Sequence, residues 1–488
     1  MAKKGESNEV KSGEKGITVK KSEDISEWYS QVILKAGVAD YAPIKGCMVI
    51  RPLGYSIWTR IQDYFNQVLE SYQVENAYFP LFVPESFFKR EAEHAEGFSP
   101  EVAWIERKDL SEERLALRPT SETIMYHSYS KWIRSWRDLP LKINQWCNII
   151  RWETNAVKLF LRSREFLWQE GHCVYETEEE CIKEADEYIK EYKNLCESLL
   201  AIPVKIGRKT DSEKFAGAVF TNTMEALMPD GKATQLGTTH HLGQNFSKAF
   251  DIEFLGKDSQ KHYPFQNSWG FSTRLVGSMI MLHSDDKGLV LPPKAAPIQV
   301  VIIPIFREDA KEKVLAEAEK LRKSLSGIKV KVDSREGLTP GWKFNEWELK
   351  GVPVRIELGM RDIENHAFVA CRRDSGEKQS FKLSEAAQVI PGLLDEIQKS
   401  LFEKAVNSIE KRTKKTADFV EMVQEINKGN WVEVPFCGEK PCEADIREKT
   451  EGITSRVITG NISKEQGETS CINCSKKARY FVIFSRAY

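Results

Sequence analysis

The stretch NIIRWETNAVKLFLRSREFLWQEGH, from Asn148 to His172, sets charged side chains among large apolar residues. Arg151 and Glu153 follow one apolar run, and a loop with Lys158, Arg162 and Arg164 leads into the next. Arginine stays charged under physiological conditions, so an arginine in an apolar setting normally has an anionic partner. The pattern predicts a strand that ends at RWE, a basic loop and a returning strand EFLWQEGH, and it indicates a bound anion.

The composition is that of a globular protein, with 41% hydrophobic and 29% charged residues in a chain of 488. This length fits about two to four domains. Apolar runs such as IQVVIIPIF, from Ile298, are too short to cross a bilayer, and the lysine-rich N-terminus has no apolar signal core. We therefore expect a cytoplasmic protein with no membrane role. The net charge of −1 means that a nucleic acid would have to meet local basic patches.

Changes of pattern along the chain predict five segments. Residues 1–16 carry too little apolar surface to fold and predict a disordered tail. Residues 17–290 mix amphipathic helices with β-rich runs, which predicts an α+β domain with an extensive antiparallel sheet. After a linker at 291–297, residues 298–398 alternate strands and helices and predict a compact α/β domain. Residues 399–488 contain a charged helical stretch and a small cysteine-containing module.

Four of the ten cysteines form two close pairs near the C-terminus. Cys437 and Cys442 lie in CGEKPC, and Cys471 and Cys474 lie in CINC. Each pair can bind one side of a tetrahedral ion, so the pattern predicts a four-thiolate zinc site. Two disulfides are the alternative, although nothing else in the sequence indicates an oxidising compartment. The other cysteines lie in apolar or helical contexts, where reduced and buried thiols are expected.

Three separated motifs together resemble those of the class II aminoacyl-tRNA synthetases. The first is an amphipathic helix followed by VENAYFPLFVPES, in which Pro80 is expected to end a short apolar strand. The second is the RWE stretch with its basic loop. The third is GFSTRLVGSMIMLHSDD, in which Arg274 is expected to open a buried helix.

Further stretches resemble the prolyl-tRNA synthetase family from about Ile17 to the C-terminus. They are LRPTSE, LPLKINQWCNIIRWE, SREFLWQEGH, EKFAGA and THHLGQNF. The short interval between the second and third motifs and the cysteine module resemble the archaeal and eukaryotic-type branch, because the bacterial type would carry a large insertion in that interval.

The resemblance implies a class II antiparallel-sheet catalytic domain, an α/β anticodon-binding domain and a small C-terminal zinc-binding α/β module. The implied reaction attaches L-proline to tRNA(Pro) through a prolyl-adenylate and releases AMP and pyrophosphate. It uses ATP and Mg²⁺, and the cysteines would bind a structural Zn²⁺. The first motif implies a homodimer. Lysines, arginines and aromatic residues around GWKFNEWELKGVPVRIELGMRD would meet the anticodon, with no single contact assigned.

The resemblance also implies adjoining sites for ATP and proline. In adenylate formation a carboxylate attacks the α-phosphorus of ATP, and fixed cations stabilise the charge that accumulates there. Arg151 and Arg274 would be the catalytic cations, and Phe166 and Arg274 would sandwich the adenine ring. The ATP set is Arg151, Glu153, Arg162, Ser163, Phe166, Gln235, Thr238, Ser272 and Arg274. The proline set is Thr120, Glu122, Arg151, Trp168, His172, Phe215 and His240. Gln235 is also a candidate support for magnesium.

Other interpretations remain open at this point. Taken alone, Trp168 and Phe215 would be core residues, His172 would be structural, and Arg164 would form a surface ion pair. A related synthetase for threonine, serine or histidine is the alternative within the class, which PTSE and REFLWQEGH disfavour. A catalytically silent RNA-binding or regulatory paralogue is the alternative outside it, which the intact Arg151, Glu153 and Arg274 disfavour.

Overall fold

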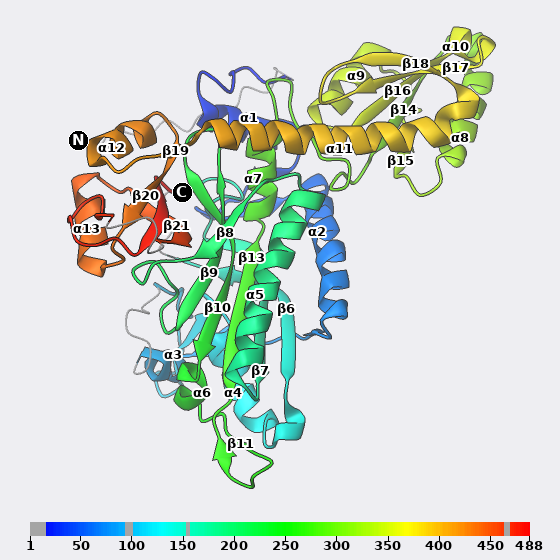
Figure 1. The fold of residues 1–488 in the computed structure, drawn as a ribbon. Coiled ribbons are helices and arrows are strands. Elements are labelled where there is room, and N and C mark those ends of the chain that lie inside the picture. The colour runs from blue at the N-terminus through cyan, green and yellow to red at the C-terminus, as the bar shows by residue number, and fades with distance from the viewer. Residues whose placement is uncertain (1–15, 93–100, 153–156, 463–468) are drawn as a thin grey trace. The chain divides into compact units, whose positions relative to one another are not determined.

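The computed structural model describes residues 16–92, 101–152, 157–462 and 469–488 (Figure 1). Residues 1–15 of the expected tail lie outside this part of the chain. The chain forms two compact units. One contains Met1–Asp40, Ile50–Gly54 and His283–Ile397, and the other contains Tyr41–Val49, Tyr55–Leu282 and Gln398–Tyr488.

The larger unit is built on one eleven-stranded sheet with the order β19-β20-β22-β21-β8-β9-β10-β13-β7-β6-β3. Its central strands are long and antiparallel, as the sequence predicted. They are β6 (Leu141–Ile150), β7 (Glu165–Tyr175), β9 (Phe220–Leu227), β10 (Ala233–Gly243) and β13 (Phe265–Ser272). Helix α5 (Glu178–Asn194) packs along β10 and β13, as Figure 1 shows.

Aromatic packing on one face of this sheet fixes α5 in place. The ring of Trp269, on β13, stacks on Tyr188 of α5 with 4.2 Å between ring centroids. Gly171, on the neighbouring strand β7, makes room for this tryptophan, because a Cβ atom there would lie 2.2 Å from the indole ring. Phe65 of α2 (Pro52–Ser71) meets Trp269 from the same side at 6.2 Å. The opposite face of the central strands is therefore left for a cavity.

The expectation that Pro80 ends a short apolar strand is wrong. Strand β3 (Glu75–Asn76) stops before it and β4 (Phe82–Pro84) begins after it. The backbone around Phe79 bonds to side chains instead of a strand neighbour. Its N–H donates to the Gln145 side chain, and its carbonyl accepts from Arg118 at 2.7 Å. Proline has no N–H to extend a ladder, so the segment stays irregular.

Residues 413–488, the C-terminal module, extend the same sheet. Its elements are β19 (Thr413–Lys415), α12 (Phe419–Asn427), β20 (Trp431–Phe436), α13 (Lys440–Lys449), β21 (Thr454–Asn461) and β22 (Tyr480–Ser485). Strand β21 joins β8 (Lys205–Arg208) through the pair Ile458 and Arg208. The backbones approach closely, since a Cβ atom on Gly207 would lie 2.3 Å from the Ile458 carbonyl oxygen. The sequence did not predict this continuity.

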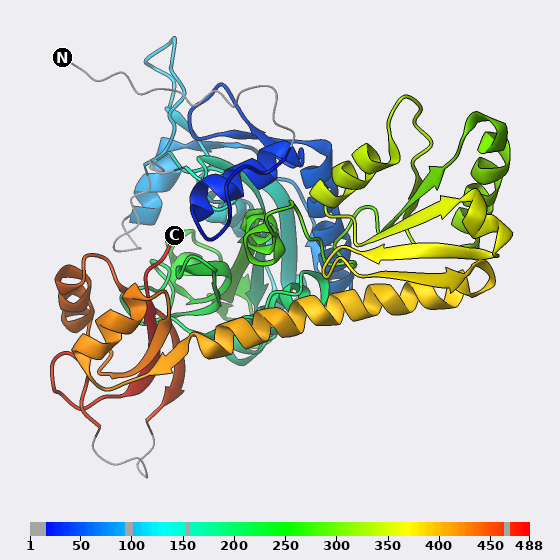
Figure 2. The ribbon, with the colours of Figure 1, turned by 90° about the horizontal axis from the view of Figure 1, so that it is seen from above.

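The smaller unit contains a five-stranded sheet with the order β15-β14-β16-β17-β18, visible in Figure 2. The predicted alternation of strands and helices is confirmed. Its elements are β14 (Val300–Ile305), α8 (Lys311–Ser324), β15 (Val330–Val332), α9 (Pro340–Leu349) and β16 (Val354–Gly359). Two antiparallel strands that the sequence did not predict complete the sheet. They are β17 (Ala367–Arg372) and β18 (Lys378–Lys382), with α10 (Met360–Glu364) before them and α11 (Ala386–Lys411) after them.

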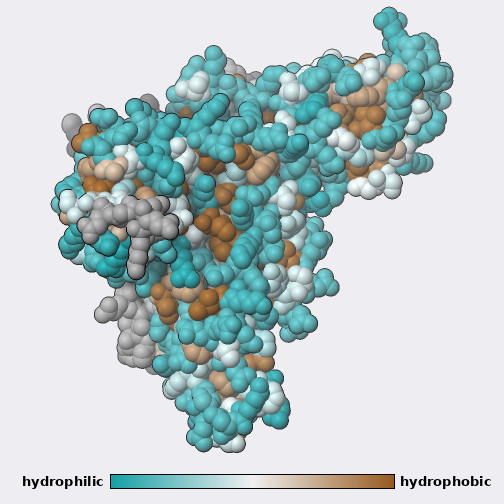
Figure 3. Space-filling view, in the orientation of Figure 1, coloured by the Kyte–Doolittle hydropathy of each residue, from teal (hydrophilic) through white to brown (hydrophobic). Residues whose placement is uncertain are grey.

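The remaining elements are short or flank the two sheets. The helices are α1 (Ile25–Lys35), α3 (Glu85–Ala92), α4 (Glu122–Trp132), α6 (Asn245–Ala249) and α7 (Arg274–His283). The strands are β1 (Ala39–Tyr41), β2 (Met48–Ile50), β5 (Leu115–Leu117), β11 (Phe254–Leu255) and β12 (Lys261–His262). In the described part of the chain, no helix has the length and apolar character that a membrane span requires. The face seen in Figure 3 is largely hydrophilic, with smaller hydrophobic areas.

The close approach at Gly207 gives a stability prediction. We expect Gly207→Ala to destabilise the protein by about 1 to 3 kcal/mol, because the new methyl group meets backbone that cannot move aside freely. Thermal unfolding and the rate of proteolytic release of the C-terminal module measure the effect. Gly460→Ala on β21 is the matched control, since a Cβ atom there meets nothing within 4 Å. Equal stability of the two variants would contradict the prediction.

Candidate active site

A cavity of about 240 Å³, the first cavity, lies on the face of the central sheet that α5 does not cover. Alternation along the strands puts it there. Asn267 and Thr239 bond to backbone carbonyls of α5 at 3.0 and 2.8 Å, so their neighbours Ser268 and His240 point to the other face. The cavity is lined by Thr120, Glu122, Arg151, Trp168, Glu170, His172, Glu213, Phe215, Thr221, Gln235, Thr238, His240, Ser268, Trp269 and Gly270.

The floor of the first cavity is a row of polar side chains that crosses four strands. Strand register aligns His172 on β7 with Ser268 on β13, His240 on β10 and Thr221 on β9. In the next row Gly270 stands between Glu170 and Thr238. Gly270 has no side chain, so the cavity is open at the centre of that row.

Glu170 is the centre of a buried hydrogen-bond network beside this floor. Its carboxylate accepts from the Ser121 hydroxyl at 2.5 Å and the Gln145 amide at 3.0 Å, and it pairs with His172 at 3.1 Å. Burial alone would raise the pKa of Glu170, but His172, Ser121 and Gln145 lower it. Burial alone would lower the pKa of His172, but the hydrogen bond and charge of Glu170, with the charge of Glu122, raise it. Each group of the pair therefore favours the charged form of the other.

Helix α4 presents a second carboxylate to the cavity. Glu122 is the first residue of α4 and is 4% exposed, and it accepts a hydrogen bond from the Thr120 hydroxyl. The hydroxyl of Tyr126, one turn along the helix, lies 3.1 Å from Nδ1 of His172. Since Glu122 also raises the pKa of His172, both carboxylates act on the same histidine. The cavity is thus suited to a small cation.

An apolar wall and a neutral histidine complete the first cavity. Phe215 packs on His240 with 4.6 Å between ring centroids. Burial, helped by the charge of His172, lowers the pKa of His240 to about 3, so its imidazole is neutral. Trp168 forms another wall, with its indole N–H 3.2 Å from the sulfur of Cys147. Trp168 and Phe215 both line the cavity and are only partly buried, which favours binding over simple core packing.

A second cavity, of about 210 Å³, shares Arg151 with the first. Its lining is Arg151, Phe160, Leu161, Arg162, Ser163, Phe166, Ser272, Arg274 and Tyr488. Arg274 opens the buried helix α7, as predicted, and donates to the Leu161 and Gln235 carbonyls at 3.1 and 3.0 Å. Burial and the nearby charge of Arg151 lower its pKa to about 10, so it stays charged at neutral pH. Three arginines around one cavity make it a site for an anion.

The two cavities bring together the site residues predicted from the sequence. The predicted proline set lies in the first cavity, and Arg162, Ser163, Phe166, Ser272 and Arg274 lie in the second. Gln235 and Thr238, predicted for ATP, line the first cavity. Glu153 lies outside the described residues. Arg164 lines neither cavity and packs over the Trp152 ring at 4.3 Å, a contact with an aromatic ring and not the expected surface ion pair.

Several lining residues were missed by the sequence reasoning. Glu170 could have been found, because it lies between Trp168 and His172 in alternation and so faces the same side of β7. Ser268 and Thr221 depend on the register of β13 and β9, which the sequence does not reveal. Tyr488 reaches the second cavity from the far end of the chain.

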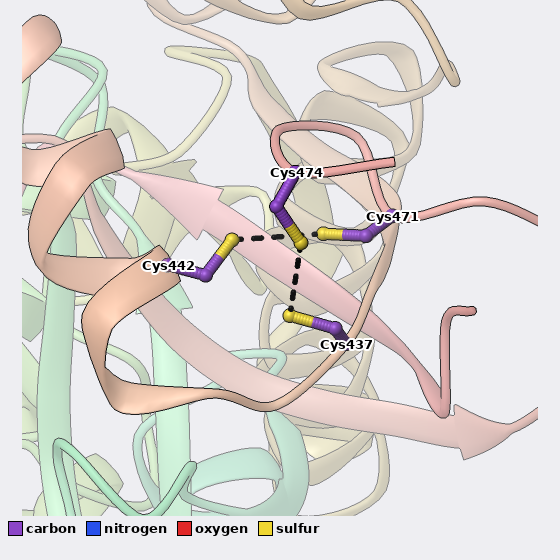
Figure 4. A group of neighbouring side chains, drawn as sticks. All are labelled: Cys437, Cys442, Cys471 and Cys474. Atoms are coloured by element: carbon purple, nitrogen blue, oxygen red, sulfur yellow. Dashed lines mark hydrogen bonds between the residues drawn. The ribbon is translucent and has the colours of Figure 1, made fainter. Parts of the chain in front are cut away.

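The four C-terminal cysteines gather at one point, as Figure 4 shows. Their sulfur atoms all lie within 4.8 Å of one another, with 3.7 Å between Cys442 and Cys471 and 3.6 Å between Cys437 and Cys474. Four sulfurs around a tetrahedral zinc ion at about 2.3 Å would be about 3.8 Å apart. The cluster therefore fits a zinc ion, whereas disulfides would require sulfurs at about 2.05 Å.

Three parts of the chain match known families. Residues 104–283 match the "tRNA synthetase class II core domain (G, H, P, S and T)", residues 299–393 match the "Anticodon binding domain", and residues 419–488 match "Prolyl-tRNA synthetase, C-terminal". The large antiparallel sheet and its arginine-lined cavity are thus those of a class II aminoacyl-tRNA synthetase.

Relatives that match over their full length identify the family within this class. The chain is 47% identical to a proline--tRNA ligase of Symbiobacterium thermophilum, which covers 98% of this chain and 100% of that one. It is 46% identical to the enzyme of Cenarchaeum symbiosum, covering 97% and 99%. A crystal structure of prolyl-tRNA synthetase from Cryptosporidium parvum, complexed with halofuginone and AMPPNP, superimposes with a TM-score of 0.92 at 44% identity over 97% of both chains. The chain belongs to the prolyl-tRNA synthetase family, the enzymes that use ATP to attach proline to its tRNA.

Some of the relatives found are bacterial and match this chain, which lacks the large insertion of the bacterial type, over almost their whole length. The match covers 96% of the Alkaliphilus oremlandii enzyme and 97% of the Clostridium novyi enzyme, so little of either sequence remains unmatched. The branch that this chain resembles therefore includes bacteria as well as archaea.

The His172–Glu170 pair predicts a pH-dependent stability difference. Because the pKa of His172 is raised, its contribution is complete below about pH 6.5 and is lost as pH rises through its folded value. Because the pKa of Glu170 is lowered, its contribution is present above about pH 4.3 and is lost as pH falls through its folded value. The stability gap between the unchanged protein and His172→Gln should be largest between these limits, at about 3 kcal/mol, and narrow in alkali.

Thermal unfolding from pH 5 to pH 9 measures this gap. His262→Gln is the control, because His262 pairs with Asp258 at the surface with exposed fractions of 46% and 55%. Such an exposed pair contributes little to stability, because water and salt screen its charges. A His172→Gln gap that is the same at both ends of the pH range would contradict the ion pair.

Proposed function

We propose that this protein charges tRNA(Pro) with L-proline in two steps, and that the two cavities which meet at Arg151 are the proline and ATP sites. The single observation that carries the proposal is the position of Arg151. It lines both the carboxylate-containing first cavity and the arginine-lined second cavity. One guanidinium can therefore contact the amino-acid carboxylate and the α-phosphate at the same time.

In the first step a proline carboxylate oxygen forms a bond to the α-phosphorus. The bond between the α-phosphorus and the bridging oxygen breaks, and pyrophosphate leaves with the electron pair. Negative charge grows on the phosphoryl oxygens, where Arg151 and Arg274 stabilise it in a partly dry site. Arg162 contacts the outer phosphates, and Phe166 and Arg274 enclose the adenine ring. In the second step a hydroxyl at the 3′ end of the tRNA attacks the prolyl carbonyl, and AMP leaves.

Proline recognition follows from the charge and shape of the first cavity. The secondary ammonium pairs with Glu122 and the Thr120 hydroxyl, while Trp168 and Phe215 pack on the ring. Glu122, Glu170 and His172 are close enough to hold a metal ion. However, Glu170 and His172 already bond to each other at 3.1 Å, so an ammonium at Glu122 fits the hydrogen bonding better.

Two metal ions and a second chain belong to the proposal. Mg²⁺ bound with ATP would neutralise phosphate charge, and the amide oxygen of Gln235 is a candidate ligand for it. Cys437, Cys442, Cys471 and Cys474 would hold Zn²⁺, which would stabilise the C-terminal module. The protein is a cytoplasmic homodimer. Support for the dimer comes from exposed apolar side chains just before the first motif and in the first turn of its helix, namely Tyr41, Ile44, Val49 and Tyr55 at 50 to 57% exposure.

The smaller unit supplies the anticodon contacts. Its helix α9 and strand β16 combine aromatic and basic side chains, and Arg355 lies over the ring of Phe344 at 4.3 Å. Unpaired bases are recognised by such stacking and by edge hydrogen bonds. A catalytically silent paralogue is disfavoured because Arg151 and Arg274 remain in one cavity.

The role of Arg151 is tested by Arg151→Ala. Loss of a cation that contacts the transition state should cost about 3 to 4 kcal/mol, which is a 100- to 1,000-fold loss of proline-dependent pyrophosphate exchange. The variant should remain folded and sediment as a dimer. Arg137→Ala is the control, since Arg137 packs over Trp136 and lines neither cavity. Near-normal exchange in Arg151→Ala would remove this arginine from the mechanism, and absence of exchange with proline in the unchanged protein would reject the function.

The zinc proposal is tested by metal analysis. Protein purified without chelators should contain about one zinc ion per chain, and Cys471→Ser should lose it because three thiolates remain. The variant should release the C-terminal module at a lower temperature. Cys371→Ser, on β17 of the smaller unit, should keep the metal. Protein without zinc, or a Cys471→Ser variant that retains it, would reject this site.

A further inference from the structure

Three charged side chains form a buried cluster where the C-terminal module meets the central sheet. Glu225 on β9 accepts from Lys209 at 2.8 Å and from two nitrogens of Arg456 at 2.9 and 3.2 Å. The side chains of Glu225, Lys209 and Arg456 are 0%, 2% and 8% exposed. Lys209 and Glu225 come from the catalytic part of the chain, whereas Arg456 lies 231 residues beyond Glu225. The cluster is therefore a charged connection between two distant parts of the sequence.

The backbone of β21 is shaped to deliver Arg456 to this position. The register of β21 against β22 shifts between Ser455 and Val457, so Arg456 is the extra residue of a bulge. A bulge turns a side chain away from its normal direction in the strand. Beside it, the Ser455 hydroxyl lies 3.0 Å from that of Thr210. These contacts fix the guanidinium against Glu225.

The cluster adjoins the residues that hold Arg274 in the second cavity. Glu225 is directly opposite Gln235 in the pairing of β9 with β10. Paired Cβ atoms of this kind are about 5 Å apart. The backbone carbonyl of Gln235 in turn accepts from Arg274 at 3.0 Å. A displacement of Glu225 would therefore move the segment of β10 whose carbonyl binds Arg274. The charge of Glu225 also acts on Arg274, since it raises a pKa that burial lowers.

We propose that Arg456 is a positioning residue for ATP: by binding Glu225 it fixes the β9–β10 pairing at Gln235 and, through the Gln235 carbonyl, the guanidinium of Arg274. The inference rests on the proposed function of the second cavity as the ATP site. Arg456 itself lines neither cavity, and its own charge lowers the pKa of Arg274, so its positioning effect on Arg274 runs through Glu225.

The proposal predicts different effects on the binding of ATP and of proline. Glu122, which would bind the proline ammonium, and the Glu170–His172 pair beside it are held by hydrogen bonds that involve neither Glu225 nor Arg456. Loss of Arg456 should therefore weaken ATP binding more than proline binding. A residue with a purely structural role would instead reduce the amount of folded enzyme and leave both KM values unchanged.

The experiment compares Arg456→Met with the unchanged full-length dimer. Methionine keeps much of the apolar length and removes the charge and the donors. We expect KM for ATP in pyrophosphate exchange to rise at least tenfold and KM for proline to change by less than twofold. Calorimetric titration with AMPPNP should show the same loss of affinity without catalysis. Arg479→Met is the matched control in the C-terminal module, because Arg479 pairs with Glu439 at the surface with exposed fractions of 61% and 41%.

Two further variants make each outcome decisive. Arg456→Met leaves the buried Glu225 carboxylate paired with Lys209 alone, so this pair still balances in charge. In the double variant Arg456→Met, Glu225→Gln the buried Lys209 ammonium loses its carboxylate, so this variant should be less stable than Arg456→Met and should not regain ATP affinity, since the connection is still absent. If Arg456→Met does not fold, Arg456→Lys is measured instead. We expect its KM for ATP to rise at least threefold and its KM for proline to stay unchanged. Unchanged KM for ATP in the folded variants, or equal changes for ATP and proline, would overturn the proposal. Failure of the unchanged protein to exchange with proline would reject the proposed function instead.

Discussion

The alternation of side chains along β7 is the constraint on which the rest of the site depends. Odd-numbered positions such as Gln169 and Gly171 face the α5 side, where Gly171 admits the ring of Trp269. The residues between them, Trp168, Glu170 and His172, therefore line the first cavity. A shift of one residue in register would exchange these two sets and remove both the core packing and the site. The antiparallel pairing with β6 and β13 on either side prevents that shift.

Two buried carboxylates in the described part of the chain, Glu170 and Glu225, each have several partners. Glu170 accepts several hydrogen bonds in addition to pairing with His172, and Glu225 is shared between two cations. An ionised carboxylate at zero exposure would otherwise be strongly disfavoured. Such networks contribute little net stability compared with apolar packing, but they define one geometry. In this protein the defined geometry lies directly beside the two cavities.

Much of the site could be predicted from the sequence because it is encoded in contiguous motifs. Arg151, Arg274 and the basic loop stand in short stretches whose order and spacing are visible without a structure. The strand predicted to end at Pro80 is absent because the backbone beside it bonds to the Gln145 and Arg118 side chains. Hydrogen bonds of this kind leave no periodic pattern in the sequence. The outer strands β17 and β18 were missed because they follow a short helix and continue the sheet in the antiparallel sense. The contact of Arg456 with Glu225 joins residues 231 apart, which no local pattern could reveal.

The continuous eleven-stranded sheet also determines how the protein avoids self-association through its strand edges. A long exposed sheet edge presents unpaired N–H and C=O groups with which a strand of another chain can pair. Here the edge of β8 is covered by β21, and the sheet ends in β3, of two residues, and β19, of three. The outer strand β19 has the sequence TKK, and lysine at an edge disfavours pairing with another sheet. Without the C-terminal module, β8 would be an exposed edge of the catalytic sheet. With the module in place, the sheet ends at the short and charged strand β19, which disfavours aggregation.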